Sequence, residues 1–200
     1  MADNAALVPE PHYTYADYRA WDLKEGERYE LIDGIPCAMS APSDRHQAVL
    51  VALAAAFYNF FREGPCRVRP APYDVRLFYR PDGTDDTVVQ PDLSVVCSEE
   101  RRGPEGCRGA PDLVVEILSS SNTAIEMIRK FNLYRQAAVR EYWVVSPEEK
   151  TIHAYCFQGE RVTNRVYGGA AGFAADPAAG TAAPEIFPGL EIELEPVFAE

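Results

Sequence analysis

The stretch APDLVVEILSSSN, residues 110–122, decides the fold because one residue in it does not match its surroundings. The apolar residues on either side of Glu116 are typical of a β-strand that is buried on both faces. A lone carboxylate in such a strand would lose its hydration, at a cost of several kcal/mol. Glu116 therefore needs a proton, a cationic side chain or a metal ion as its partner.

The partner of Glu116 is expected on a neighbouring strand. Asp112 shares its face of the strand, but four residues of strand span roughly 13 Å, too far for one shared ion. Asp92, in VVQPDLSVV (88–96), is the better candidate, because an adjacent antiparallel strand would bring the two β-carbons to about 5 Å. Two facing carboxylates share a proton or bind a cation, and a divalent ion is the solution that we favour. The alternative is that Glu116 pairs with an Arg or Lys.

Asp112 is expected to have a structural role. It lies at a corner between a loop and a strand, where an aspartate commonly accepts backbone hydrogen bonds.

The rest of the chain predicts an α/β protein with a mixed β-sheet flanked by helices. A strand, a helix and a strand in succession suggest a parallel crossover. Extra β-hairpins are expected near both ends, the first around Asp33-Gly34. The expected elements are a hairpin at 29–39, a helix at 44–63 capped by Ser43, strands at 74–79 and 88–96, a strand at 113–119, a helix at 124–138 capped by Thr123 and Glu126, a strand at 141–146, a hairpin at 151–167 and a last strand at 190–198.

Length and charge limit the possible functions. The 200 residues are expected to form one domain, with a flexible segment at 1–13 and a low-complexity loop at 168–184. The net charge of −12 repels nucleic acid overall, so a DNA site would need a local basic patch or bound cations.

Candidate DNA contacts lie in the charged loop 98–111. They are Arg101, Arg102 and Arg108. The same loop holds three glutamates, so it could equally be a solvated surface loop.

The cysteines and the apolar runs argue against secretion and membrane insertion. Five cysteines are an odd number without paired short spacing, which argues against a disulfide framework or a zinc site. We expect reduced thiols in a cytoplasmic protein. The chain has no run of eighteen apolar residues, so we expect no membrane span.

Several further motifs occur in a characteristic order and spacing. They are RYELIDG (28–34), His46-Gln47, Pro91-Asp92, GAPDLVVEILS (109–119), Lys130 with Tyr134, VREYWVV (139–145) and PGLEIEL (188–194). Together they resemble the PD-(D/E)XK nuclease superfamily and, within it, the bacterial Uma-type restriction endonuclease family. The resemblance covers roughly residues 14–198. It implies a restriction-endonuclease-like core and metal-dependent hydrolysis of DNA phosphodiester bonds.

The sequence departs from the family pattern at two places. The superfamily motif has a lysine two residues after the glutamate, where this chain has Leu118; in the Uma-type pattern a helix lysine replaces it, and Lys130 matches that lysine. SSSN (119–122) lacks the usual proline, and Glu126 stands where Asp is usual. The alternative for Lys130 is a solvated i,i+4 pair with Glu126.

The resemblance assigns roles to a small set of residues. Asp92, Glu116 and Lys130 are the predicted catalytic residues. Asp92, Glu116 and the carbonyl of Ile117 would hold Mg²⁺ or Mn²⁺, and Lys130 would orient the attacking water. Tyr134, one turn further on, would only pack beneath Lys130.

The secondary candidates are Glu30, His46, Gln47 and Glu126. Glu30 faces away from the apolar side of its hairpin strand. His46 lies in the first turn of its helix, where the helix dipole disfavours a charged imidazole.

Two classes of function remain open from the sequence. The first is a DNA endonuclease, expected to be a homodimer because cutting both strands favours a twofold axis. The second is an inactive nuclease-like scaffold that binds a partner protein or nucleic acid. The net charge and the unusual SSSN stretch favour the scaffold, whereas the apposed carboxylates favour the enzyme.

Overall fold

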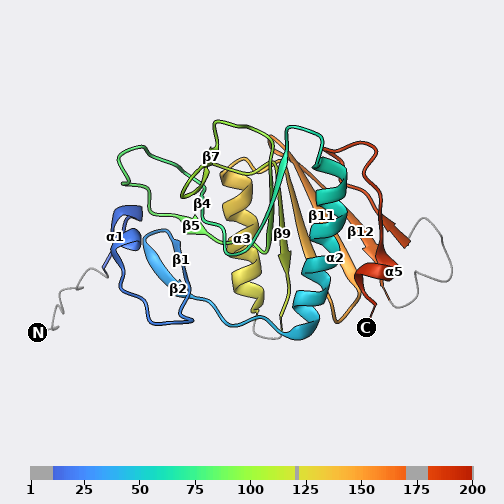
Figure 1. Cartoon of the computed structure of the whole chain (residues 1–200), viewed down its shortest axis with the longest axis horizontal. Helices are drawn as coiled ribbons and strands as arrows, with labels where there is room; N and C mark the ends of the chain where they lie inside the picture. The colour runs from blue at the N-terminus through green and yellow to red at the C-terminus, as the bar shows by residue number, and fades with distance from the viewer. Residues whose placement is uncertain (1–10, 120–121, 170–179, 200) are drawn as a thin grey trace, which may run out of the picture.

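The computed structural model describes residues 11–119, 122–169 and 180–199 of the chain. It is an α/β structure with two six-stranded sheets and helices packed against them (Figure 1). The expected mixed α/β class is confirmed.

The main sheet carries the centre of the fold. Its order is β12 (Arg161–Gly168), β11 (Thr151–Gln158), β10 (Glu141–Ser146), β9 (Leu113–Ile117), β6 (Leu93–Val96) and β3 (Arg67–Pro70). β9 is parallel to β10 and antiparallel to β6. Helix α3 (Ala124–Gln136) connects β9 to β10, so the predicted parallel crossover is confirmed.

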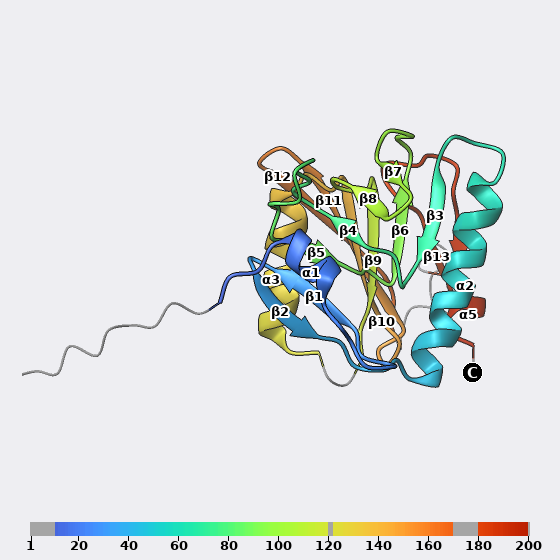
Figure 2. The ribbon, with the colours of Figure 1, turned by 60° about the vertical axis from the view of Figure 1, so that its left-hand side comes forward.

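Two helices cover opposite faces of the main sheet (Figure 2). Helix α2 (Asp44–Phe61) begins where predicted, because the Ser43 side chain accepts a hydrogen bond from the backbone N–H of His46. Its apolar side packs with Val115 and Trp143, whereas α3 packs on the face that carries Val114. Glu116 alternates with Val115 and therefore faces the α3 side.

The second sheet packs on the α3 side of the main sheet. Its order is β2 (Ile35–Ala38), β1 (Tyr29–Ile32), β5 (Val88–Val89), β4 (Val75–Arg76), β8 (Gly106–Arg108) and β7 (Arg102–Gly103). Because β1 and β2 pair around Asp33-Gly34, the predicted N-terminal hairpin is confirmed.

Three predictions for this part of the chain are wrong. The single strand expected at 88–96 is split, because β5 belongs to this sheet and β6 to the main sheet. The strand expected at 74–79 ends after Arg76, where a turn begins, and the guanidinium of Arg76 forms a buried ion pair with Asp85. The loop expected at 98–111 contains β7 and β8. Gly106, at φ +132°, permits this because a β-carbon there would collide with the carbonyl of Asp74.

The C-terminal part is only partly as predicted. The hairpin of β11 and β12 is confirmed. The last strand is wrong beyond residue 193: β14 (Ile192–Glu193) pairs with β13 (Thr181–Ala182), and α5 (Leu194–Val197) follows. Leu194 and Val197 are buried in the core beneath α2, and a helical turn buries both at once.

The two segments expected to lack a core lie partly outside the described residues. Of the described parts, Tyr13 donates its backbone N–H to the carbonyl of Gly34, and helix α1 (Tyr15–Ala20) follows. At the other end, Ala182 is fully buried in the main core.

One disulfide contradicts the expectation of reduced thiols. Cys66 and Cys97 are bonded, whereas Cys37, Cys107 and Cys156 are free. The antiparallel register of β3 and β6 extends to place residue 66 opposite residue 97. The two cysteines are 31 residues apart in the sequence, so their spacing gave no indication of the pairing.

Within the described ranges, no helix is long and apolar enough to cross a membrane.

Candidate active site

The Asp92 and Glu116 positions meet at the end of β6 and β9. Leu93 pairs with Val115 in the antiparallel ladder, so the next positions outward are those of Asp92 and Glu116. Asp112 lies at the opposite end of β9, where its carboxylate accepts hydrogen bonds from the backbone of Cys97 at 2.9 Å and from Arg140 at 3.2 Å. The geometry therefore joins Glu116 with Asp92 and gives Asp112 structural contacts.

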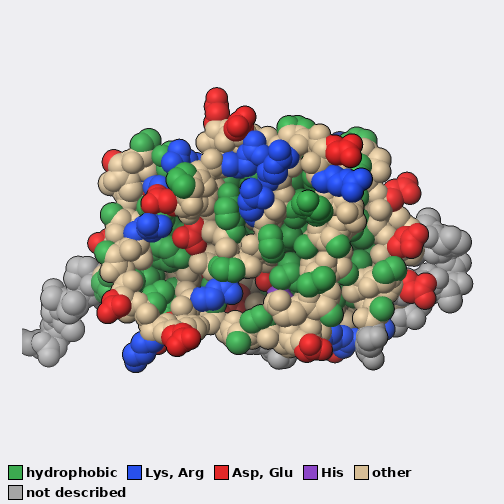
Figure 3. Space-filling view, viewed as in Figure 1, with side chains coloured by type: hydrophobic (Ala, Val, Ile, Leu, Met, Phe, Trp, Pro, Cys, Tyr) green, Lys and Arg blue, Asp and Glu red, His purple; other side chains and the backbone are tan. Residues whose placement is uncertain are grey.

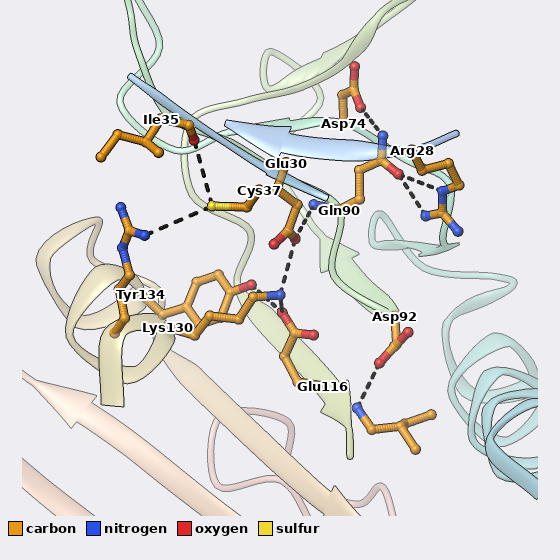
Figure 4. A network of polar contacts seen from close by, with 12 residues as sticks. Arg28, Glu30, Ile35, Cys37, Asp74, Gln90, Asp92, Glu116, Lys130 and Tyr134 are labelled. Atoms are coloured by element: carbon orange, nitrogen blue, oxygen red, sulfur yellow. Dashed lines mark hydrogen bonds and ion pairs between the residues drawn. The ribbon is translucent and has the colours of Figure 1, made fainter. Parts of the chain in front are cut away.

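Lys130 points from α3 into this site (Figure 4). Its Nζ donates to Glu116 Oε1 at 2.8 Å and to Glu30 Oε1 at 3.1 Å. Glu126 instead accepts a hydrogen bond from the backbone of Thr123 as part of the predicted capping box. The alternative of a solvated Glu126–Lys130 pair is therefore wrong.

Tyr134 does more than pack beneath Lys130. Its hydroxyl donates to the same Glu116 oxygen at 2.5 Å, and the side chain is fully buried. Glu116 Oε1 thus has two donors from one face of α3, an ammonium and a phenol. The predicted alternative that Glu116 pairs with a basic side chain is also realised, through Lys130.

Burial and neighbouring charges shift the pKa values of this cluster. Burial, together with the charges of Asp92 and Glu30, raises the pKa of Glu116 to about 7, although Lys130 opposes the shift. Burial lowers the pKa of Lys130, but Glu116 and Glu30 outweigh this effect and hold it above its usual value. At neutral pH Lys130 stays charged, and Glu116 is the group poised to change its protonation.

His46 adjoins Asp92 from the first turn of α2. Its Nε2 lies 3.2 Å from Asp92 Oδ2, the same oxygen that accepts the backbone N–H of Ile117 at 2.7 Å. Burial lowers the pKa of His46, but the hydrogen bond and charge of Asp92 outweigh it, so the pKa is raised. The helix dipole alone favours a neutral imidazole, but the carboxylate of Asp92 stabilises the charged form more strongly.

A cavity of about 400 Å³ opens over this cluster. Figure 3 shows a hollow in the lower middle of this face, with acidic and histidine atoms in it. The cavity wall includes every predicted catalytic, metal-binding and secondary residue, namely Glu30, His46, Gln47, Asp92, Glu116, Ile117, Glu126 and Lys130.

The predicted DNA contacts lie elsewhere. Arg101, Arg102 and Arg108 do not belong to the cavity wall as far as the described residues define it. Arg101 donates to the carbonyl of Ala110, and Arg108 lies 5.7 Å from the ring centre of Tyr79.

A polar network behind Glu30 was not anticipated from the sequence. The backbone N–H of Gln90 donates to Glu30 Oε1 at 2.9 Å, and its side chain binds Arg28 and Asp74 (Figure 4). Gln90 is a polar residue between the apolar Val88-Val89 of β5 and Pro91-Asp92, and this was the signal available in the sequence. Arg28 and Arg129 also line the cavity and were not singled out either.

The carboxylates of Asp92 and Glu116 have the donor chemistry that a divalent metal requires. No group of three or more His, Cys, Asp or Glu side chains has metal-binding geometry in the described part of the chain. Glu116 Oε2 and Asp92 Oδ1 accept no hydrogen bond from described residues, and Figure 4 shows both carboxylates beside the same space. Mg²⁺ commonly binds one or two carboxylates and keeps several waters, so two carboxylates fit such an ion.

One family model, one related sequence and one solved structure resemble this chain. The family model described as "Uma2: Putative restriction endonuclease" matches residues 15–195. "Uncharacterized protein slr1290" from Synechocystis sp. is 28% identical over 156 residues, covering 78% of this chain and 80% of that protein. The crystal structure of "a putative nuclease belonging to DUF820" from Anabaena variabilis superposes with a TM-score of 0.70. It is 19% identical, with 93% of this chain and 97% of the other covered, and shows a shared fold.

Proposed function

Because the chain belongs to the Uma2 family, whose description is "Putative restriction endonuclease", we propose that it is a divalent-metal-dependent endonuclease that hydrolyses DNA phosphodiester bonds. The observation that carries the proposal is the convergence of Asp92, Glu116 and Lys130 on one cavity floor. A scaffold gains nothing from placing two carboxylates at opposed positions of a buried ladder, because they repel each other.

The charge balance of the cavity floor supports a bound cation. Glu30, Asp92 and Glu116 bring three negative charges when ionised, and Lys130 brings one positive charge. The negative charge that remains around Lys130 attracts a divalent cation such as Mg²⁺ or Mn²⁺, and Arg28 and Arg129, which also line the cavity, reduce it. Asp92, Glu116 and the carbonyl of Ile117 would hold the ion, which supplies Lewis-acid activation of the phosphate and of water.

Lys130 contributes as a fixed positive charge. Its ammonium is held by two carboxylates and keeps its proton at neutral pH, so it acts as a hydrogen-bond donor and not as a base. From this position it orients the attacking water and offsets negative charge that develops on the phosphoryl group. Tyr134 acts as a positioning residue, because its hydroxyl fixes Glu116.

The secondary candidates act around these three residues. Glu30 positions Lys130, and His46 positions Asp92. Gln47 and Glu126 line the cavity, although Glu126 also caps α3. As part of the same proposal, a homodimer provides one site for each DNA strand, and a DNA substrate makes the cytoplasm the place of action.

The test combines DNA cleavage with thermal melting in the presence and absence of Mg²⁺ or Mn²⁺. A metal that binds only the folded protein raises the melting temperature. We expect Asp92→Ala to lose both cleavage and this rise. Lys130→Ala should lose cleavage by about 100-fold or more and keep the rise, because an ammonium is no metal ligand. The exposed Lys24→Ala is the matched control and should keep both.

Two results would contradict the proposal. A Lys130→Ala protein that cuts DNA at the normal rate removes the assigned role of Lys130. A wild-type protein whose melting is unchanged by either metal, and which cuts no DNA, favours the scaffold, for which the net charge of −12 is the supporting observation.

A further inference from the structure

Three arginines, Arg67 and Arg69 of β3 and Arg102 of β7, form a surface that we call the arginine patch. Arg67 Nη1 donates to the carbonyls of residues 64 and 66, at 2.6 and 2.9 Å. Arg102 Nη1 donates to the intervening carbonyl of residue 65 at 3.3 Å. Both guanidinium groups therefore lie against the same turn of backbone.

Arg69 joins this surface through Tyr73. Burial raises the pKa of the Tyr73 hydroxyl, and the positive charges of Arg69 and Arg102 lower it. The charges of both arginines therefore act on the same hydroxyl group. Arg67 and Arg69 are two positions apart on β3, so they also share one face of the strand.

The charges of the arginine patch are not compensated by acidic side chains. Among the residues that the structure describes, none of the three forms an ion pair with a carboxylate, whereas Arg76, Arg129 and Arg140 all do. This is unexpected in a chain with 31 acidic and 19 basic residues. The patch guanidiniums are held by neutral carbonyls, including that of Val68 for Arg69, and keep their full charge for an external anion.

The edge strand β3 leads from the patch to the cavity. Ala71 directly follows β3, lines the cavity and donates its backbone N–H to the carbonyl of Asp92 at 3.0 Å. Figure 3 shows a dense group of Lys and Arg side chains over the region of β7 and the start of β3, on the face that also shows the hollow. Arg67 and Arg69 are about 6.6 Å apart along the strand, similar to the separation of neighbouring phosphates in a nucleic acid strand.

We propose that the arginine patch binds the phosphate backbone of DNA and guides one strand along β3 towards the cavity. This inference rests on the proposed nuclease function and extends it to an interaction surface. Guanidinium forks match phosphate oxygens, and contacts of this kind position a duplex without reading its sequence. The path from β3 through Ala71 to the cavity of the proposed nuclease favours a nucleic acid over an acidic protein.

The experiment measures binding of a fluorescent DNA duplex in EDTA, which separates binding from cleavage, over a range of salt concentrations. The variant carries Arg67→Gln, Arg69→Gln and Arg102→Gln. The control carries Arg135→Gln, Arg161→Gln and Arg165→Gln, three surface arginines of α3 and β12 with the same change in net charge. Each lost phosphate contact should reduce the slope of log K against log salt by about 0.9, hence about 2.7 for the patch variant. The control should retain the wild-type slope.

Several results would overturn the inference. One is a patch variant that binds DNA with the wild-type slope; another is an equal loss in the control. A third is a variant that loses binding of poly-glutamate more than binding of DNA, which would assign the patch to an acidic protein. If the triple variant fails to fold, Arg69→Gln alone should still reduce the slope by about 0.9.

Failure of this inference is distinguishable from failure of the proposed function. If the wild-type protein binds DNA through the patch but does not cut DNA with either Mg²⁺ or Mn²⁺, the inference stands and the proposed enzyme function is rejected. If cleavage requires metal and Lys130 but the patch variant keeps the wild-type binding slope, the proposed enzyme function stands and the inference about the patch is rejected.

Discussion

The cavity and the arginine patch hold positive charges in opposite ways. In the cavity, Lys130 is buried between Glu30 and Glu116, and its charge is compensated within the protein. In the patch, Arg67 and Arg69 bind only backbone carbonyls among the described residues, and their charges stay uncompensated. A compensated charge organises the interior of a site, whereas an uncompensated one at the surface attracts a partner from solution.

The largest expected effect comes from removing the compensated charge. Lys130→Met leaves two carboxylates without their cation, so the free energy of unfolding at pH 7.5 should fall by about 3–5 kcal/mol. Urea denaturation without metal measures this loss. The double variant Lys130→Met/Glu116→Gln should lose less than the sum of the single variants, because one unpaired carboxylate is gone. A loss below about 1 kcal/mol in Lys130→Met would show that the stability of the protein does not depend on the ion pairs of Lys130 with Glu30 and Glu116.

The next effect concerns the disulfide that ties the start of β3, directly before Arg67, to the end of β6. The bond closes a loop over a sequence separation of 31 residues, so Cys66→Ala/Cys97→Ala should lower the free energy of unfolding by about 3–4 kcal/mol. Urea denaturation with dithiothreitol is the control: the reductant should destabilise the wild type and leave the double variant unchanged. If the reductant destabilised both proteins equally, the Cys66–Cys97 disulfide would not be the bond that stabilises the wild type.

A smaller effect is expected from pH, again in the cavity. The pKa of Glu116 rises from an unfolded value near 4.5 to about 7 in the metal-free folded protein, so the folded state binds the proton more tightly. Its stabilising contribution is complete below pH 4.5 and is lost as pH rises through 7, by up to about 3 kcal/mol. Glu116→Gln should lack this decline between pH 5 and 8. Parallel stability profiles for the two proteins would rule out the raised pKa.

The smallest effect is expected in the patch. Arg69→Gln breaks no ion pair in the described structure, so the free energy of unfolding should change by about 0.5 kcal/mol or less. Arg76→Gln is the matched contrast, because Arg76 is buried against the carboxylate of Asp85, and it should cost about 3 kcal/mol or more. Urea denaturation measures both losses. Similar losses in the two variants would show that the ion pair of Arg76 does not distinguish it from Arg69.

The cavity was largely predictable from the sequence, because its signals are local. A glutamate within an apolar strand and an aspartate before the next one predict apposition across a ladder, and the structure has that register. Lys130 follows from the position of α3 directly after β9. Glu30 was only a secondary candidate because its contact with Lys130 spans 100 residues and depends on how the second sheet packs.

The patch was mostly not predictable, because its members meet only through register. Arg102 was anticipated as a DNA contact, but in a loop and without its neighbours. Arg67 and Arg69 lie on a short edge strand with no motif, and the disulfide beside them joins cysteines without a recognisable spacing. For these arginines the sequence shows the residue type, but strand pairing and packing determine which charges have no carboxylate partner.

The helix origin of Lys130 also has a consequence for the order of synthesis. Glu30, Asp92 and Glu116 all precede Lys130 in the chain, so a growing polypeptide acquires its three acids before their cation. β10, which pairs with β9 and completes the crossover, follows later still. A chain interrupted before residue 130 would therefore contain the three acids without the lysine that binds Glu30 and Glu116, so the proposed site is complete only after α3 has been synthesised.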